Sequence, residues 1–268
     1  MDITSHFRTF ILENNNQKLP KEFESFDFNI APEVYPTKLI DFFTEAKIEV
    51  FGHDVDFSQI LRENNDCSSV LKKLSALSIK YLKLGVDWPF EDIQKEALAI
   101  DRKDYKVTDP YGRWMAAPLH SYIHDPTSMK SPKRLEKLGL PDPWSMDWTE
   151  FAERCPKTVE WIKNDPLYKN IHRVGFLILE PGGYVKPHSD YDYAALSGVN
   201  YAITHPKECY WTMKEHGSVD FQPGDCILMD YSPYHSVINL SSETRIHMLR
   251  GGHFNMDYLL EVLRKTYL

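Results

Sequence analysis

The chain has 268 residues, of which 42% are hydrophobic and 26% charged, the composition of a globular protein with a sizeable core. Its formal charge of −8 argues against a broad phosphate-binding surface, and so against nucleic acid as the main partner. No apolar run approaches the roughly 20 residues that span a bilayer, and the N-terminus lacks the pattern of a signal peptide. The four cysteines show no CxxC spacing, which indicates reduced thiols, so we expect a cytoplasmic protein without a membrane partner.

Up to about residue 165 the apolar residues recur mostly at helical spacing. The segment 68–84 predicts a helix whose apolar face comprises Val70, Leu74, Leu77, Tyr81 and Leu84. Residues 142–164 also indicate a helix, which Pro156 must break or restart. Between these segments, residues 101–141 are rich in Pro, Gly, Asp and Lys and predict loops with a few short elements.

After Asn170 the pattern changes to seven short β-like runs separated by turns. Short strands at close, regular spacing favour an antiparallel sandwich or barrel over βαβ units. The chain then closes with an amphipathic helix that has Asn255 as its N-cap. The predicted strands cover residues 172–180, 198–204, 209–214, 218–221, 226–231, 235–240 and 245–251.

The sequence therefore predicts an α+β protein whose three parts form one structural unit. A mainly helical N-terminal extension, residues 1–165, packs as a layer on a β core, residues 166–256, and a short C-terminal helix, residues 257–268, follows. The apolar face of that last helix is suited to packing on its own barrel or on a second subunit of an oligomer. The pattern does not distinguish the two.

The stretch "PGGYVKPHSDYD", residues 181–192, contains the candidate metal ligands His188 and Asp190. An HxD triplet alone is a weak signal, because it occurs by chance in a chain of this length. In extended backbone, however, residues i and i+2 project to the same side, so both side chains can reach one ion. His235 follows the later run "CILMDYSPY" and offers a second imidazole. Two histidines and one carboxylate form the facial triad of non-haem Fe(II) sites.

Arg245 follows His235 by 10 residues, on the next predicted strand. A guanidinium there is suited to binding a carboxylate through two parallel hydrogen bonds. His247 lies two residues further on and shares the face of Arg245, either lining the same pocket or packing in the core. The order strand, HxD, strands, His, Arg is the order that a double-stranded β-helix requires.

Four features between about Asp147 and Asn255 occur together in one known family. They are "CPKTVEWI", "FLILEPGGYVKPHSD", "QPGDCILMDYSPYHSVIN" and the spacing of 10 from His235 to Arg245. With them the chain resembles the aspartyl/asparaginyl β-hydroxylase family of Fe(II)/2-oxoglutarate dioxygenases. The resemblance implies a jelly-roll or cupin-like core in which His188, Asp190 and His235 hold Fe(II).

The resemblance also implies the reaction. The co-substrate 2-oxoglutarate would bind the metal, with its distal carboxylate on Arg245. A C–H bond of the substrate would be hydroxylated with dioxygen, releasing succinate and CO2. Some members carry an arginine nine residues after the first histidine, where this chain has Ser197. We expect Ser197, Asn200 and His247 to bind the co-substrate beside Arg245.

The identity of residue 190 bears on the substrate. Many peptidyl hydroxylases of the family have glycine there, whereas free-amino-acid hydroxylases that resemble them, such as L-proline cis-4-hydroxylases, have the aspartate that this chain keeps. We therefore expect a free amino acid or a small amino-acid derivative as substrate, with a protein or peptide Asp/Asn side chain as the alternative. The expected substrate contacts are Tyr191, Tyr193, Trp211 and Arg113, although in a chain with 13% aromatic residues each aromatic is equally suited to packing.

Two competing interpretations concern metal binding. His120 and His124 stand four residues apart, the spacing of two ligands on one helix face, but they lack the glutamate of H-E-x-x-H and precede Pro126. We interpret them as a surface or loop pair. A non-catalytic, metal-binding jelly-roll module is the alternative of another class. Arg245 separates the two, because a purely structural metal has no need of a cation that binds an organic acid.

Overall fold

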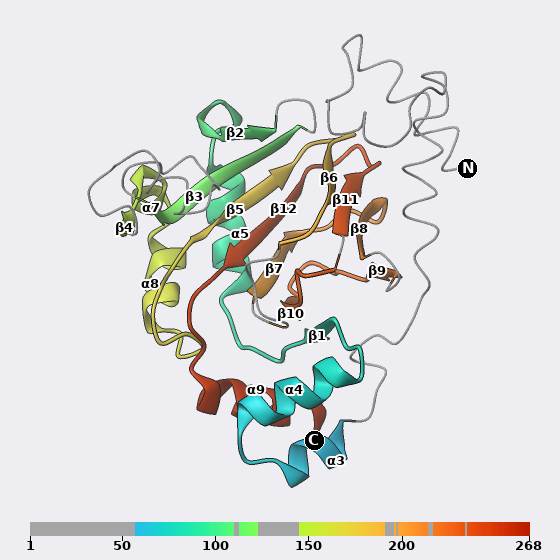
Figure 1. Cartoon of the computed structure of the whole chain (residues 1–268). Helices are drawn as coiled ribbons and strands as arrows, with labels where there is room; N and C mark the ends of the chain where they lie inside the picture. The colour runs from blue at the N-terminus through green and yellow to red at the C-terminus, as the bar shows by residue number, and fades with distance from the viewer. Residues whose placement is uncertain are drawn as a thin grey trace, which may run out of the picture.

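The computed structural model describes residues 57–109, 113–122, 145–190, 196, 198–213, 217–233 and 235–268. Within them two antiparallel sheets face each other, and the larger one carries helices on its outer side (Figure 1). The larger sheet has eight strands in the order β1-β10-β7-β12-β5-β3-β2, with β4 paired to β3. The smaller sheet has four strands in the order β6-β11-β8-β9.

The chain crosses repeatedly between the two sheets. Strands β5, β7, β10 and β12 belong to the larger sheet, and the strands that alternate with them in sequence, β6, β8, β9 and β11, belong to the smaller one. This alternation is the double-stranded β-helix, or jelly roll, expected from the sequence. The bounds are β5 Val174–Leu179, β6 Tyr184–His188, β7 Gly198–Thr204, β8 Cys209–Met213, β9 Gly217–Val219, β10 Cys226–Met229, β11 His235–Asn239 and β12 Arg245–Arg250.

All seven predicted strands are confirmed, but the sequence pattern missed β6, the strand that ends at His188. The two glycines just before it, Gly182 and Gly183, and Pro187 within it resemble a turn. Proline is tolerated here for two reasons. Strand β6 lies at the edge of its sheet, and its register against β11 shifts between the pairs His235–His188 and Val237–Val185, which places Pro187 in a bulge.

The segment before residue 165 contributes strands as well as helices. Four strands, β1 to β4, join the larger sheet and lengthen it on both sides of the jelly-roll strands. Two of them arise within the segment that was predicted to be mostly loop. The bounds are α3 Ser58–Glu63, α4 Cys67–Ala76, β1 Tyr81–Lys83, α5 Phe90–Ala99, a 3₁₀ turn Arg102–Asp104, β2 Lys106–Asp109, β3 Trp114–Tyr122, β4 Met146–Trp148, α7 Glu150–Arg154 and α8 Pro156–Asn164.

The single helix predicted over residues 68–84 is wrong in its second half. Helix α4 ends at Ala76, Ser78 adopts a positive φ of 61°, and Tyr81 starts strand β1. Leu77, predicted for the buried face, is 53% exposed. The helical spacing is accidental beyond Ala76, because Tyr81 faces the core between the sheets while Leu82 faces the helices. The helix predicted over residues 142–164 starts only at Glu150, because residues 146–148 form strand β4. The break predicted at Pro156 is confirmed, since α7 ends just before it and α8 starts there.

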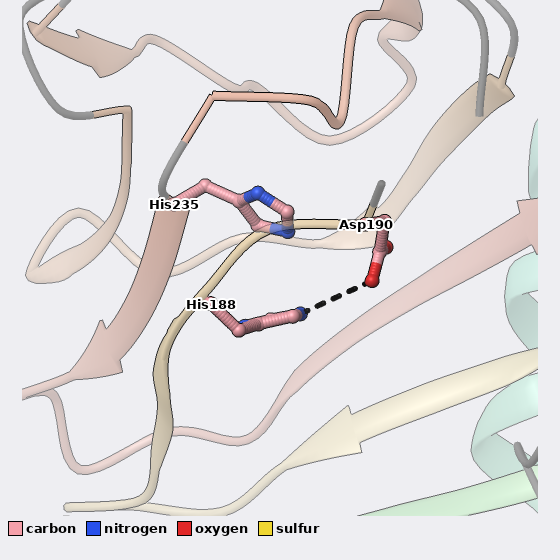
Figure 2. A group of neighbouring side chains, drawn as sticks. All are labelled: His188, Asp190 and His235. Carbon is pink, nitrogen blue, oxygen red and sulfur yellow. Dashed lines mark ion pairs between the residues drawn. The ribbon is translucent and has the colours of Figure 1, made fainter. Parts of the chain in front are cut away.

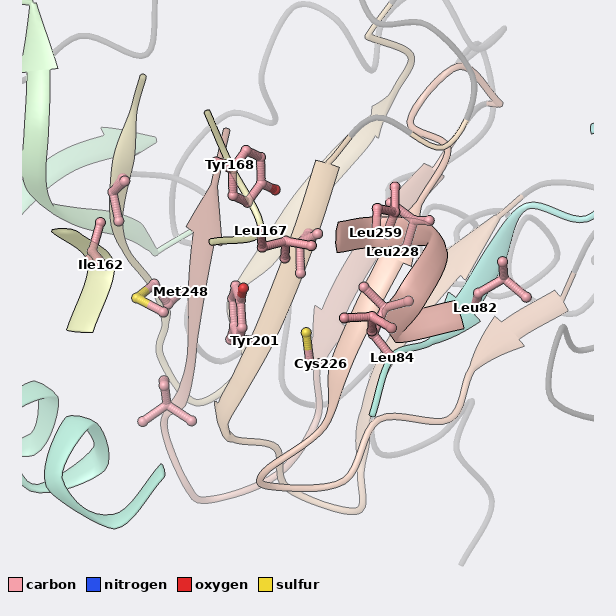
Figure 3. Close-up of a cluster of buried hydrophobic side chains, with 14 of the residues drawn as sticks. Leu82, Leu84, Ile162, Leu167, Tyr168, Tyr201, Cys226, Leu228, Met248 and Leu259 are labelled. Atoms are coloured by element: carbon pink, nitrogen blue, oxygen red, sulfur yellow. The ribbon is translucent and has the colours of Figure 1, made fainter. Parts of the chain in front are cut away.

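Alternation along the strands of the larger sheet divides the interior into two cores. Residues such as Tyr201, Leu228 and Met248 pack against the helices (Figure 3). On the opposite face, Ala202, Ile227 and Met229 pack against Trp211 and Val237 of the smaller sheet. Because the side-chain period of a strand is two, the residues that alternate with Met248 on β12 face the space between the sheets.

The C-terminal helix, α9 Met256–Tyr267, buries its apolar face within its own chain. Leu259 and Leu263 are fully buried, and Arg264 donates hydrogen bonds to the carbonyl oxygens of Leu61 and Asn64 near α3. Asn255 occupies the N-cap position as predicted, but its side chain makes no capping hydrogen bond. Of the two packing modes left open by the sequence, the structure shows packing on the same chain.

Candidate metal centre

The side chains of His188, Asp190 and His235 converge at one end of the smaller sheet (Figure 2). Strands β6 and β11 are antiparallel, so the last residue of β6, His188, lies opposite the first residue of β11, His235. One ligand atom from each of the three residues lies within 4.8 Å of the other two. The imidazole centroids of the two histidines are 4.3 Å apart, and Nε2 of His188 is 3.9 Å from Oδ1 of Asp190.

The loop that carries Asp190 is fixed by its backbone and by the residue beside it. The amide of Asp190 donates to the carbonyl oxygen of Tyr231 over 3.1 Å, and Oγ of Ser189 donates to the carbonyl oxygen of Ser232 over 2.7 Å. Neither bond uses the carboxylate. The carboxylate of Asp190 is therefore held in place while its oxygens remain available to an ion.

The groups around the ring of His235 fix its orientation and its tautomer. Its Nδ1 lies 2.9 Å from the carbonyl oxygen of Pro233, and a carbonyl can only accept, so Nδ1 carries the proton and Nε2 the lone pair. Trp211 stacks on the imidazole at a centroid distance of 5.1 Å and an interplanar angle of 12°. Burial, followed by the proximity of His188, lowers the pKa of His235 to about 4. The imidazole is therefore neutral, the state that binds metals.

Arg245 lies at the start of β12 and is 2% exposed. Its Nη2 is 2.8 Å from Nδ1 of His247, but its Nε makes no hydrogen bond, and no described carboxylate forms an ion pair with it. Burial lowers the pKa of Arg245 to about 10, so the guanidinium stays charged at neutral pH. A buried charge without a counter-charge is costly, which indicates a site built for an anion.

A buried polar cluster surrounds this guanidinium. Nδ1 of His247 is also 2.7 Å from Oδ1 of Asn200, and Nε2 of His247 is 2.9 Å from Nδ1 of His205. Nε2 of His205 is 2.9 Å from the carbonyl oxygen of Cys209. His205 was not singled out in the sequence, because a histidine in the turn after a strand has no distinguishing spacing.

The candidate metal ligands and the Arg245 cluster border the same core between the sheets. Trp211 stacks on His235, and Phe221 packs edge-on against His247 at 4.6 Å. Trp211 and Phe221 belong to one cluster of buried apolar side chains. The structure thus places an imidazole–carboxylate group and a guanidinium without a carboxylate partner among the described residues around one apolar interior.

The remaining predicted site residues are found in different settings. Trp211, expected to contact substrate, is buried against the ring of His235. Nη1 of Arg113 donates to the carbonyl oxygen of Pro181 over 3.0 Å, which fastens this residue to the turn between β5 and β6. Tyr191, Tyr193 and Ser197 lie outside the described residues.

The rival histidine pair is also only partly described. His120 lies in strand β3, half-buried, with its Nδ1 on the carbonyl oxygen of His172 and its ring edge-on to Trp148. His124 lies outside the described residues. Among the described residues, His188, Asp190 and His235 form a group of potential metal ligands whose donor atoms lie close enough together to hold one ion.

Two histidines and one carboxylate that converge in this way are the donor set of the non-haem Fe(II) oxygenases. The family model for aspartyl/asparaginyl β-hydroxylase matches residues 89–250, more than half of the chain. The chain belongs to this family. It is therefore an Fe(II)/2-oxoglutarate-dependent oxygenase of the hydroxylase type.

Three solved structures are remotely similar to this chain. A 2OG-Fe(II) oxygenase family oxidoreductase from Burkholderia pseudomallei is 8% identical, with a TM-score of 0.44, over 69% of this chain and 88% of that one. A prolyl-4-hydroxylase from Pseudomonas putida is 9% identical, with a TM-score of 0.38, over 70% and 98%. A viral collagen prolyl hydroxylase from Paramecium Bursaria Chlorella virus-1 is 12% identical, with a TM-score of 0.36, over 64% and 94%.

No curated protein matches the chain. As for the membrane, the described part of the chain contains no helix with the length and apolarity needed to span one.

The buried histidines predict a loss of stability in acid. Burial, and then the charge of Arg245, lowers the pKa of His205 to about 4, below its ordinary value of about 6.5. A group whose pKa is depressed by folding contributes stability that is present above its unfolded pKa and lost as the pH falls through its folded pKa. Titration of His205 should therefore lower the free energy of unfolding by roughly 2–3 kcal/mol between pH 7 and pH 4.

Urea unfolding at several pH values checks this prediction. Carboxylates also titrate in this range, so the comparison is with His205→Asn, which cannot gain the proton. We expect the unfolding free energy of the variant to fall less steeply between pH 6.5 and pH 4 than that of the wild type. Parallel pH profiles for the two proteins would show that His205 does not titrate on unfolding.

Proposed function

We propose that His188, Asp190 and His235 hold the Fe(II) of this oxygenase and that Arg245 binds the distal carboxylate of 2-oxoglutarate. The single observation that carries the proposal is the buried guanidinium. Arg245 is 2% exposed and has no carboxylate partner among the described residues. A co-substrate with a terminal carboxylate supplies the missing counter-charge.

The residues present fit Fe(II). Two imidazoles and one carboxylate, with ligand atoms within 4.8 Å of one another, are the donor set of the facial triad, which leaves coordination positions open for co-substrate and dioxygen. When bound, Fe(II) and 2-oxoglutarate supply the activation of dioxygen, chemistry that no side chain provides.

The other residues of the site orient groups and exclude water. Trp211 covers one face of the His235 imidazole and, by stacking on it, restricts its rotation. The carbonyl oxygen of Pro233 fixes the proton on Nδ1 of His235. Apolar side chains such as Val185, Phe221 and Val237 line the interior between the sheets, where low polarity strengthens the attraction between the guanidinium and an incoming carboxylate.

For the substrate, we propose a free amino acid or a small amino-acid derivative. Asp190 supports this choice, because the free-amino-acid hydroxylases that resemble this chain keep the aspartate that many peptidyl members have replaced by glycine. A protein or peptide Asp/Asn side chain is the alternative that the description of the family favours.

A mass-spectrometric screen tests the substrate class. The protein with Fe(II), 2-oxoglutarate and air is incubated with each free amino acid, and separately with peptides containing Asp or Asn. We expect one or a few free amino acids to gain one oxygen atom, with one succinate formed per product. Hydroxylation confined to the peptides would contradict the proposed substrate class. Turnover of neither set, with no succinate formed, would contradict the proposed function.

A further inference from the structure

The guanidinium of Arg245 is connected through two histidines to a backbone carbonyl. The contacts run from Nη2 of Arg245 to Nδ1 of His247, 2.8 Å, and from Nε2 of His247 to Nδ1 of His205, 2.9 Å. The series ends at the carbonyl oxygen of Cys209, 2.9 Å from Nε2 of His205. Both imidazoles are used at both nitrogens, and His247 is completely buried.

The two ends of this series fix the direction of every hydrogen bond. A guanidinium can only donate, and a backbone carbonyl can only accept. Nδ1 of His247 must therefore accept from Arg245, and Nε2–H of His247 must donate to His205. His205 then accepts at Nδ1 and donates from Nε2 to Cys209. With both imidazoles neutral, this is the single tautomer arrangement that satisfies all three contacts.

Asn200 is compatible with this arrangement. Its Oδ1 lies 2.7 Å from Nδ1 of His247. A half-turn of the amide places its NH2 group at that position, where it shares the single lone pair of Nδ1 with Nη2 of Arg245. The opposite tautomer of His247 would place an N–H against the guanidinium and leave His205 with an acceptor against the Cys209 carbonyl. Burial and the adjacent charge of Arg245 also hold the pKa of His247 well below its usual value, which keeps the ring neutral.

The fold holds His205 in place independently of these bonds. A register shift in the pairing of β7 with β12 lies between Ile246 and His247, and bulges of this kind redirect the side chains beside them. His205 follows β7 directly. Phe221 packs against both imidazoles, 5.3 Å from His205 and 4.6 Å from His247.

From this geometry we infer that His205 is a positioning residue for the dicarboxylate co-substrate. It selects the tautomer of His247 that accepts from Nη2 of Arg245, and so fixes the guanidinium without neutralising its charge. A carboxylate at position 247 would hold the arginine equally well but would cancel the charge that the co-substrate needs. The inference rests on the proposed role of Arg245. It attributes the selectivity for a distal carboxylate to His247 and His205, which orient the guanidinium.

The test compares two ligands that differ only at the end that Arg245 binds. Binding of 2-oxoglutarate and of 2-oxopentanoate, which has the same chain length and no distal carboxylate, is measured by anaerobic calorimetry on the full chain with Fe(II). The ratio of their Kd values reports the carboxylate contact alone. We expect the wild type to prefer 2-oxoglutarate by about 100-fold or more.

Two amide substitutions separate the hydrogen bonds of His205. In His205→Asn the amide lies where Nδ1 was and still offers an acceptor to His247, whereas in His205→Gln it lies where Nε2 was and faces Cys209. We expect the Asn variant to keep the ligand preference within about 3-fold and the Gln variant to lose about 10- to 100-fold of it, the range for hydrogen bonds to charged groups. Phe221→Leu, which alters packing but no hydrogen bond, should weaken both ligands alike.

The outcomes distinguish failure of the role inferred for His205 from failure of the role proposed for Arg245. If the wild type binds both ligands equally, the role proposed for Arg245 fails. If the wild type prefers 2-oxoglutarate and His205→Gln keeps that preference, the inference about His205 alone is overturned. Equal weakening of both ligands in His205→Gln would assign His205 a structural role, which also overturns it.

Discussion

Asp190→Ala is expected to abolish turnover, with succinate formation falling by about 1000-fold or more, and to lower the affinity for Fe(II) by at least about 100-fold. Asp190 supplies the carboxylate among the three converging side chains, and its removal leaves only two imidazoles. Metal content after gel filtration and succinate formation measure the two effects.

The fold should survive this substitution. The backbone amide of Asp190 and the side chain of Ser189 hold the loop, and the carboxylate of Asp190 is 39% exposed. We expect the thermal melting of the metal-free variant to match that of the wild type. Asp92→Ala, which removes an exposed carboxylate from α5, is the matched control and should retain metal and activity. Full metal content in the Asp190 variant would show that the carboxylate is not a ligand.

Arg245→Leu is expected to separate co-substrate binding from stability. Truncation of one partner of a buried charge pair costs about 2–5 kcal/mol of binding, so the Kd for 2-oxoglutarate should rise by about 30-fold or more. In the ligand-free protein, however, the guanidinium has no carboxylate partner among the described residues, and its replacement removes a desolvation cost. The ligand-free variant should therefore melt at the same temperature as the wild type or higher.

Arg245→Lys is the matched control for charge. An ammonium keeps the charge but cannot form two parallel hydrogen bonds to one carboxylate, so the Kd should lie between those of the wild type and the Leu variant. Calorimetric titration of 2-oxoglutarate and thermal melting of the ligand-free proteins measure the two effects. An unchanged Kd in Arg245→Leu, or a large drop in melting temperature without ligand, would show that Arg245 serves the fold instead.

The strands of the jelly roll could be predicted because each has apolar residues bounded by turn residues, and the helix break at Pro156 follows from proline chemistry. Strand β6 could not, because its proline is accommodated by two tertiary features, an edge position and a bulge. Strand β1 was missed because Tyr81 and Leu84 continue the helical spacing of α4 by accident. The secondary-structure propensity of the residues and the spacing of apolar positions contain no information about which sheet a segment will join.

Some residues of the candidate site could likewise be predicted from the sequence and others could not. The i, i+2 spacing of His188 and Asp190 and the distant His235 could be recognised, because local backbone geometry and the order of strands determine where they meet. His205 could not be recognised, because its relation to His247 depends on a register shift between β7 and β12 that no local pattern encodes. The same holds for Trp211, whose packing on His235 depends on the pairing of β8 with β11.

The most direct test of the site is an anaerobic titration of 2-oxoglutarate into the Fe(II)-loaded protein, followed by its visible difference spectrum. Three protein ligands on the metal and a guanidinium for the distal carboxylate predict a weak charge-transfer band that saturates at one 2-oxoglutarate per chain. The band should be absent in Asp190→Ala and should require far more 2-oxoglutarate in Arg245→Leu. A wild-type protein that shows no band, or a band unaffected by both substitutions, would contradict the assignment of these residues.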